Sequence, residues 1–309
     1  GTHVRLRHTT ALCVGSSGLE YHYGLGIDFM GSGASEEYMV LRAPYTSGYQ
    51  VLGMTTSLFV EVDRSGDLSY VGSGEVDVLT SGVYEVGVSF RTSPRVTGGY
   101  VRMEVDRGLS SERVLLRYGT PTSFGFEFLG STRAISLNSG STVRFIFDLS
   151  GGGVWTGGTM RVYLRRMRSG AVTFASTSAL GVSSIPGSYN LWNNLSPTVT
   201  SAYVTESSNR FTFRTAGLYR VYYGFSMELS GGTASAIRMY VGQPGPRGGY
   251  GGSYIAFTGI AMSELALGNT FTLDVTLPLE ISFWTTDLGE ASLRNYDVFA
   301  GSVAFEYLG

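Results

Sequence analysis

The sequence predicts an all-β protein that contains two tandem copies of one sandwich domain, and an internal repeat is the first observation behind this prediction. The segment EVDVLTSGVYEVGVSF, which begins at Glu75, recurs 135 positions later as RFTFRTAGLYRVYYGF, which begins at Arg210. The next strand-like segment recurs at almost the same offset, as VRMEV from Val101 and IRMYV from Ile237. A repeat of this length is as long as a domain, so it indicates tandem copies of one folding unit.

Composition and periodicity are the second and third observations. The chain has 44 Gly, 20 Tyr and 17 Phe, while charged residues make up only 15% of it. This mixture is typical of short strands joined by turns. Val76, Val78, Tyr84 and Val86 alternate with polar or small residues, which is the period of a half-buried strand. Turn signals such as Asn-Ser-Gly and runs of glycine separate the short strands, as in a β-sandwich.

These signals divide the 309 residues into four parts. Residues 1–49 lie outside the repeat and are expected to form an extended arm that docks on a neighbouring subunit, because they contain little material for a core. Residues 50–168 are assigned to the first sandwich and residues 188–309 to the second. Residues 169–187 are expected to be a linker that contains one short apolar stretch.

Three motifs of the second copy point to a known fold. An aromatic strand followed by a Gly-x-Tyr element runs from Phe211 to Val221, and a leucine–glycine–polar turn with an apolar strand runs from Leu265 to Leu273. A closing Phe-x-Gly strand follows at 298–307. These motifs resemble the tumour necrosis factor-like jelly roll, a family that includes the globular heads of complement-type proteins. The resemblance implies two tandem jelly-roll β-sandwiches behind an extended N-terminal arm. It is weaker in the first copy, which keeps Gly82-x-Tyr84 and the turn at 137–143 but lacks a clean closing strand.

Members of this family are typically trimers, so the resemblance also implies a homotrimer. Tyr222 is a candidate residue of the subunit interface. Tyr84 and Tyr219 share a strand face with apolar residues and are expected to be buried, whereas Tyr222 lies on the opposite face of its strand. In a monomer this ring would be in water. It is therefore either an incidental exposed aromatic or an interface anchor.

The basic residues are unusual, because all 22 of them are Arg. Compositional drift is one explanation, and selection for Arg at packed subunit contacts is the other. Arg161, Arg165 and Arg166, with Arg168, form the one basic cluster and are a candidate subunit interface. Contact with nucleic acid inside a particle is the alternative. The net charge of −2 and the lack of interleaved aromatics give no reason to expect a direct nucleic-acid partner.

The pattern of reactive side chains argues against catalysis. His3, His8, His22 and Cys13 all lie within the first 49 residues, so neither copy of the repeat contains His or Cys. This removes Cys–His pairs, Ser–His–acid triads and most metal sites from both sandwiches. A Gly-x-Ser-x-Gly elbow and a Lys-containing phosphate loop are missing as well. We therefore expect no enzyme activity, no catalytic residue, no metal site and no cofactor.

One glycine-rich segment is a candidate for partner contact. Residues 242–253 read as four Gly-x-y triplets, which are too few and too tethered for a collagen helix. A mobile surface loop is expected instead, with Arg247 and Tyr250 at its tip.

Together these observations favour a non-enzymatic virion structural protein, namely a trimeric head-decoration or fibre component of the bacteriophage type. Such a protein stabilises the particle or mediates attachment. Its expected partners are further copies of itself, other virion or capsid proteins, and a host-surface receptor or glycan. A membrane span is not expected, since no sufficiently long apolar run exists. The alternatives are a secreted, extracellular ligand or adhesin of the same fold and a major capsid protein.

Overall fold

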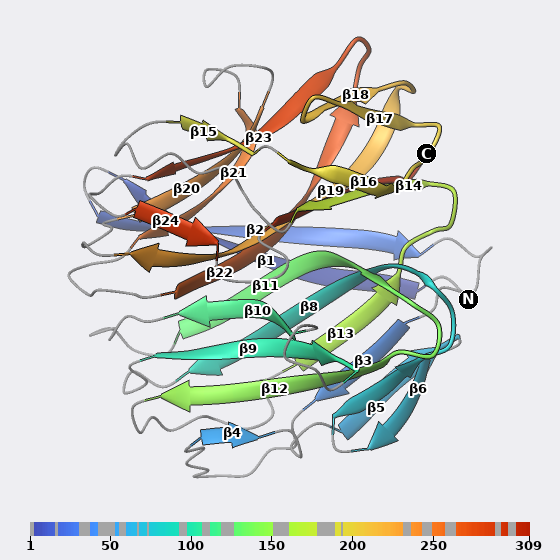
Figure 1. Ribbon diagram of the computed structural model, residues 1–309, viewed down its shortest axis with the longest axis vertical. Helices are drawn as coiled ribbons and strands as arrows, with labels where there is room; N and C mark the ends of the chain where they lie inside the picture. The colour runs from blue at the N-terminus through green and yellow to red at the C-terminus, as the bar shows by residue number, and fades with distance from the viewer. Residues whose placement is uncertain are drawn as a thin grey trace.

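The computed structural model describes residues 3–15, 18–30, 38–42, 53–55, 60–66, 68–72, 74–92, 98–106, 112–118, 127–150, 161–177, 189–192, 194–230, 236–242, 249–256, 264–287, 292–295 and 301–309. Every regular element in these ranges is a β-strand, so the all-β prediction is confirmed. Figure 1 shows most strands of the first jelly roll in the lower part of the molecule and most strands of the second in the upper part.

The first jelly roll consists of two five-stranded layers of antiparallel strands. One layer has the order β5–β3–β13–β8–β11, and the other has the order β6–β7–β12–β9–β10. Alternate residues of both layers point inward, where Tyr84, Leu164, Met103 and Phe145 belong to one buried apolar core. The strand bounds are β3 Tyr38–Arg42, β5 Val60–Ser65, β6 Leu68–Gly72, β7 Glu75–Val78, β8 Gly82–Thr92, β9 Gly98–Val105, β10 Glu112–Tyr118, β11 Glu127–Leu137, β12 Thr142–Ser150 and β13 Arg161–Arg166.

The second jelly roll has the same construction. Its layers have the orders β16–β14–β25–β19–β22 and β17–β18–β23–β20–β21. The core between them is rich in aromatic rings, with Phe211 and Phe305 in contact at a centroid distance of 4.7 Å. The strand bounds are β14 Val172–Thr177, β16 Ser196–Val199, β17 Val204–Ser207, β18 Arg210–Phe213, β19 Gly217–Ser230, β20 Ala236–Gly242, β21 Gly249–Ala256, β22 Glu264–Val275, β23 Glu280–Asp287 and β25 Gly301–Tyr307.

The two jelly rolls therefore match strand for strand, in both layers and in chain order. The match extends to single hydrogen bonds. The Tyr84 hydroxyl donates to the Thr80 carbonyl at 2.6 Å, and the Tyr219 hydroxyl donates to the Thr215 carbonyl at 2.7 Å. Both tyrosine side chains are fully buried, as predicted. The sequence repeat is thus also a repeat of sheet topology and of a conserved contact within each copy.

Three short strands and one inter-sheet pairing complete the fold. β4 (Gly53–Thr55) pairs with β12, β15 (Tyr189–Leu191) pairs with β23, and β24 (Ser292–Asn295) pairs with β19. β10 of the first jelly roll pairs with β22 of the second at Arg117 and Ala266. This pairing makes one layer of each jelly roll part of a continuous twelve-stranded sheet.

The structure moves the N-terminal boundary of each jelly roll. β3, which falls within the predicted arm of residues 1–49, pairs with β13 and β5, and its Met39 and Leu41 are fully buried in the first core. β14, which falls within the predicted linker of residues 169–187, pairs with β25 and β16. Its Val172 and Phe174 are buried. The sequence does not assign either strand to a sandwich, because neither belongs to the part of the repeat that is recognisable in sequence.

The structure defines the strands of the predicted arm, whose docking on a neighbouring subunit stays a prediction, and it corrects one predicted turn. Residues 3–30 form a hairpin of two long strands, β1 (His3–Gly15) and β2 (Gly18–Met30), and β1 lies alongside β21 and β11 of the same chain. The predicted turn near Leu267 and Gly268 is instead the middle of the continuous strand β22. That strand pairs with β19 over its full length, so the polar residue after Gly268 continues the strand.

Candidate functional site

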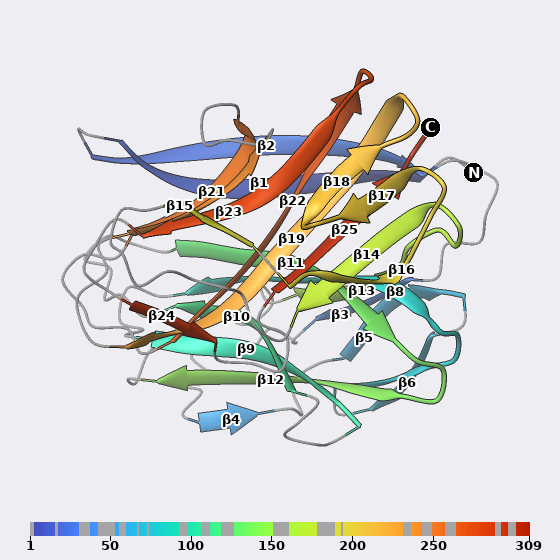
Figure 2. The same cartoon turned by 45° about the horizontal axis from the view of Figure 1, so that its top comes forward.

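The candidate site is the contact between the two jelly rolls. It is formed by the outer faces of the layers that contain β8 and β19, which are the same layer in each copy. An apolar cluster from both copies lies in this contact: Val83, Ala134, Met167, Val172, Phe174, Tyr222 and Ala304. Figure 2 shows the strands that supply it, with β14, β19 and β25 beside β8, β11 and β13. The jelly rolls are therefore joined by a small third core.

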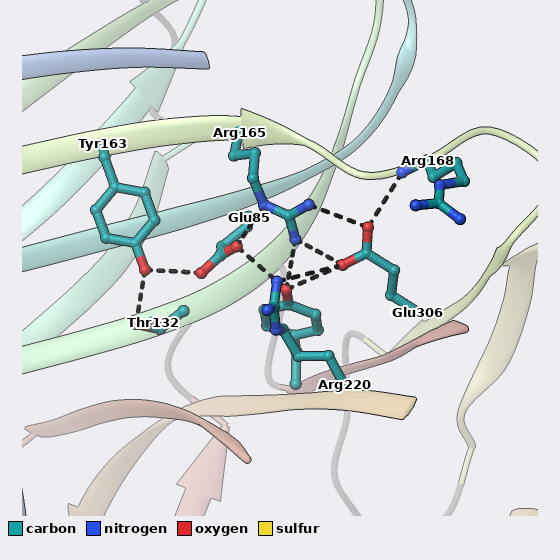
Figure 3. A network of polar contacts seen from close by, with 8 residues as sticks. Glu85, Thr132, Tyr163, Arg165, Arg168, Arg220 and Glu306 are labelled. Carbon is teal, nitrogen blue, oxygen red and sulfur yellow. Dashed lines mark hydrogen bonds and ion pairs between the residues drawn. The ribbon is translucent and has the colours of Figure 1, made fainter. Parts of the chain in front are cut away.

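A buried polar network lies next to this apolar cluster (Figure 3). Its centre is Arg165 on β13, whose Nε donates to Glu85 Oε2 on β8 at 2.8 Å. The other two nitrogens of the same guanidinium bind Glu306 on β25 of the second jelly roll, at 3.1 Å from Nη1 to Oε1 and 2.6 Å from Nη2 to Oε2. One arginine thus holds a carboxylate from each copy, the second through a bidentate pair.

Tyr222 on β19 belongs to the same network. Its hydroxyl accepts a hydrogen bond from Arg165 Nη2 at 2.7 Å. The hydroxyl proton lies within reach of both carboxylates, with Glu85 Oε2 at 3.1 Å and Glu306 Oε2 at 3.3 Å. The backbone N–H of Arg168 donates to Glu306 Oε1 at 3.2 Å. The second copy therefore supplies a phenol and a carboxylate to the arginine of the first.

A glycine makes room for the remaining members of the network. Tyr163 on β13 donates its hydroxyl proton to Glu85 Oε1 at 2.8 Å, and its oxygen lies 3.2 Å from the Thr132 hydroxyl on β11. To reach β11 the ring crosses β8 directly over Gly87, where a Cβ would collide with the ring. Gly87 is paired with Tyr163 on one side and Thr132 on the other. Only glycine permits this path of the side chain.

The network is electrically balanced and removed from water. Glu85, Arg165 and Glu306 have exposed fractions of 0%, 4% and 2%. Arg220 on β19 adds a second positive charge, with Nη1 at 3.8 Å from Glu306 Oε2. Two carboxylates and two guanidinium groups therefore offset one another, as the burial of charge requires.

The surroundings shift the protonation equilibria in a consistent direction. Burial acts to raise the pKa of Glu306, but the charge and hydrogen bonds of Arg165, together with Arg220, outweigh it and lower that pKa below its ordinary value. Burial raises the pKa of the Tyr222 phenol. Burial acts to lower the pKa of Arg165, but Tyr222, Glu306 and Glu85 raise it well above its ordinary value. Glu306 and Arg165 are thus charged, and Tyr222 is neutral, throughout the neutral range.

The ion pairs reveal an inversion of charge between the two copies. In the first jelly roll Glu85 on β8 is paired in register with Arg165 on β13, and we call these two residues row 1. In the second, Arg220 on β19 is paired in register with Glu306 on β25, and we call these two residues row 2. Row 2 is the equivalent of row 1, because β8 matches β19 and β13 matches β25. Each position of row 2 carries the opposite charge.

A second feature of the contact is a glycine pair that receives an arginine. Gly224 on β19 and Gly268 on β22 are directly paired. The side chain of Arg133 on β11 lies over both, and a Cβ at Gly224 would stand 2.7 Å from Arg133 Nε. A Cβ at Gly268 would meet both Arg133 and the Thr132 carbonyl oxygen. The edge strand β11 of the first jelly roll thus packs closely against the glycine pair on β19 and β22 of the second.

The structure brings together two of the residues that were predicted for the subunit interface, but it does so within one chain. Tyr222 is fully buried against the first jelly roll, so the expectation that a monomer leaves it in water is wrong. Arg165 is buried beside it. The prediction failed because periodicity shows which face of β19 points away from its own core and cannot show that the other copy covers that face.

Three of the other predicted residues lie in the part of the chain that the structure describes. Arg166 is partly buried and donates from Nη2 to the Ser81 carbonyl at 3.0 Å. Arg161 is paired in register with Arg42 and Ser89. Tyr250 lies in β21, where the predicted loop at 242–253 is already a strand from Gly249 onward. Arg247 lies outside the described residues.

Sequence reasoning missed Glu85 and Glu306. A signal for Glu85 was present, since the repeat aligns it with Arg220 and so shows a reversal of charge at one position. Glu306 could not be found in this way, because its relation to Arg165 depends on the pairing of the closing strands.

Metal and membrane sites were also sought in the described parts of the chain. No group of His, Cys, Asp and Glu side chains there could hold a metal ion. Among the same residues, no helix is long and apolar enough to cross a membrane.

Comparison with known proteins gives similarity of fold only. No profile of a known protein family matches the chain, and no curated protein matches it. Among solved structures, an Eiger TNF from S. frugiperda matches 44% of this chain and 94% of its own, with 13% identity and a TM-score of 0.35. Murine APRIL matches 43% of this chain and 99% of its own, with 17% identity and a TM-score of 0.33.

Proposed function

We propose that the protein is a non-enzymatic structural component of a virus particle, of the head-decoration or fibre type. The observation that supports this most is the way its two jelly rolls are joined. A separate apolar cluster and a desolvated network of four charges hold the same layer of each copy against the other. This contact makes one rigid block out of two sandwiches, a property that suits a part that bears load.

The buried charges favour rigidity over loose tethering. An ion pair with nearly no exposed surface requires accurate geometry, because small displacements leave charges without partners in a medium of low dielectric constant. Arg165 has three of its nitrogens bound by carboxylates of both copies. The relative position of the two jelly rolls is therefore tightly defined.

A homotrimer is part of the proposal, but its contacts differ from those we first expected. The face of the second jelly roll that carries Tyr222 and Ala304 is already covered by the first jelly roll. A threefold assembly would therefore be built on other surfaces. Light scattering decides the point, since the chain has a mass of 33.2 kDa and a trimer has three times that mass.

The test of the particle role is to purify virus particles from the source by density gradient and to quantify this protein in them by mass spectrometry. We expect a fixed copy number per particle that survives washing with high salt. Recovery from the extracellular fluid alone, with saturable binding to cells, would contradict the proposal. That outcome would identify a secreted ligand or adhesin.

A further inference from the structure

We propose that the inverted charges make the contact between the jelly rolls selective: the contact face of the first jelly roll accepts a second jelly roll, from its own chain or from another copy, and each face rejects its own kind. This goes beyond a particle role and does not depend on it. The interaction surface consists of row 1 and row 2 with the apolar cluster beside them.

The geometry of the two rows carries the first step of the argument. Arg165 and Glu306 stand at equivalent positions of the two copies and bind each other across the contact, at 2.6 Å between Nη2 and Oε2. Their in-row partners, Glu85 and Arg220, are equivalent as well. The contact therefore places equivalent positions together, and their pairing is attractive because these positions have unlike charges.

Pairing of like with like would reverse this balance. Two first jelly rolls joined in the same way would place one Arg165 against another, and two second jelly rolls would place one Glu306 against another. Both side chains lie out of water in the contact, with exposed fractions of 4% and 2%. Like charges that are desolvated together strongly destabilise a contact, which excludes such pairs.

Shape adds to the selectivity. Tyr222 on β19 fills the contact with a fully buried ring, whereas its equivalent on β8 is Gly87, whose space is occupied by Tyr163. A pair of second jelly rolls would bring two Tyr222 rings to a place that accommodates one. A pair of first jelly rolls would bring none. The contact is thus complementary in volume as well as in charge.

The covalent connection does not create this selectivity. β13 ends at Arg166 and β14 begins at Val172, and the exposed residues Ser169 and Gly170 lie between them. All charged groups of the network are held by strands and not by this turn. A chain that is cut here should therefore keep its two parts together.

The experiment uses the full chain with a protease site inserted between Ser169 and Gly170. After cleavage, the association of the two fragments is followed by native mass spectrometry and by gel filtration over a dilution series. Three variants are compared with the parent. One reverses row 1 (Glu85→Arg with Arg165→Glu), one reverses row 2 (Arg220→Glu with Glu306→Arg), and one reverses both rows. All four proteins have the same composition of charged residues.

We expect the cleaved parent to remain one complex, and each single-row reversal to raise the dissociation constant of the fragments at least a hundredfold. Reversal of both rows restores unlike charges and should recover most of this loss. A control reversal of Glu104 and Arg144, an ion pair within the first jelly roll, should leave association unchanged.

Several results would overturn the proposal. The first is a double-row variant whose fragments fold and associate no better than those of the single-row variants. The second is a pair of single-row variants whose fragments associate as tightly as those of the parent. The third is a control reversal that weakens association as much as the single-row reversals do. If a single-row variant fails to fold, the double-row variant still tests the proposal, because the proposal requires it to fold and to keep its two fragments associated. The purified chain suffices throughout, so failure here leaves the particle role untouched.

Discussion

Arg165 and Glu306 occupy equivalent positions in two copies of one fold, carry opposite charges and bind each other through two hydrogen bonds of 3.1 and 2.6 Å. A duplicated domain begins with identical faces, and identical faces cannot place opposite charges at one position. The two copies have therefore diverged at both residues of the row, and row 2 now carries the reverse of the charges in row 1. This reversal accounts for a buried ionic contact where the repeat alone would predict repulsion.

Removal of the central guanidinium should destabilise the protein strongly. Arg165→Met leaves Glu85 and Glu306 buried with one partner fewer, and breaking a buried pair in this way costs about 3–5 kcal/mol. Arg144→Met is the matched control, because Arg144 pairs with Glu104 and has 27% of its side chain exposed. For a pair of that kind the expected loss is about 1 kcal/mol or less. Urea denaturation of both variants measures the difference.

The contact should weaken in acid. The pKa of Glu306 is lowered in the folded protein, so the unfolded chain takes up this proton at a higher pH than the folded chain does. The stabilisation is complete above the ordinary glutamate pKa of about 4.3, and it is lost as the pH falls through the lowered value. Urea midpoints between pH 6 and pH 2 should show a smaller decline in Glu306→Gln than in the parent. Equal declines would contradict the assignment.

The repeated tyrosine hydrogen bond should contribute equally in both copies. Tyr84→Phe and Tyr219→Phe each remove one donor to a backbone carbonyl, of Thr80 and Thr215 respectively. We expect a loss of about 1 kcal/mol in each case. Replacement by Ala would also empty a fully buried site and cost about 3–5 kcal/mol. Thermal denaturation of the four variants would show whether the two copies respond alike.

The glycine pair should tolerate a methyl group unequally. In Gly268→Ala the new Cβ meets the Thr132 carbonyl oxygen, which is backbone and cannot rotate away. We expect about 1–3 kcal/mol of destabilisation from this overpacking. In Gly224→Ala the Cβ meets atoms of the Arg133 side chain, which can move, so the loss should be smaller. The two unfolding free energies, measured side by side, test this order.

Two deletions of the N-terminal region should have different results. Deletion of residues 1–37 removes the β1–β2 hairpin and retains every side chain of the two cores as the described residues define them. Deletion of residues 1–49 also removes β3, and with it Met39 and Leu41 of the first core. Each of these side chains is worth about 2–5 kcal/mol, which approaches the total stability of a domain. Circular dichroism and thermal denaturation should show a folded first jelly roll only in the shorter deletion.

Much of each sandwich could be predicted because its information is local. The alternation of Val76, Val78, Tyr84 and Val86 fixes which side of β7 and β8 faces the core, and all four side chains are buried as expected. The closing strand of the first copy, which lacks the Phe-x-Gly pattern, is nevertheless β13, in the place that β25 has in the second. Its assignment depends on pairing between distant segments, which a pattern within one strand does not contain.

The candidate site was far less predictable. The sequence indicates Tyr222 because its strand face points away from its own core, and it indicates Arg165 only as a member of a cluster of basic residues. The partner was assigned to another subunit because alternation distinguishes the two faces of a strand and gives no information on what covers the outer one. The periodicity of β8 likewise gives no reason to single out Glu85, which lies on the outer face of that strand.

The position of β25 has a consequence for the order in which the molecule can be built. This strand lies between β14 and β19, although it is synthesised after both and more than 70 residues later than the end of β19. The second sandwich therefore cannot close while the ribosome is still translating the segments before Gly301. Until then Arg165 has Glu85 as a partner but lacks Glu306, and the contact face of the first jelly roll remains exposed to water. The two jelly rolls therefore dock late, because docking depends on long-range strand pairing, which is slow to form in folding. Stalled nascent chains that stop before and after β25 would show when the docking occurs.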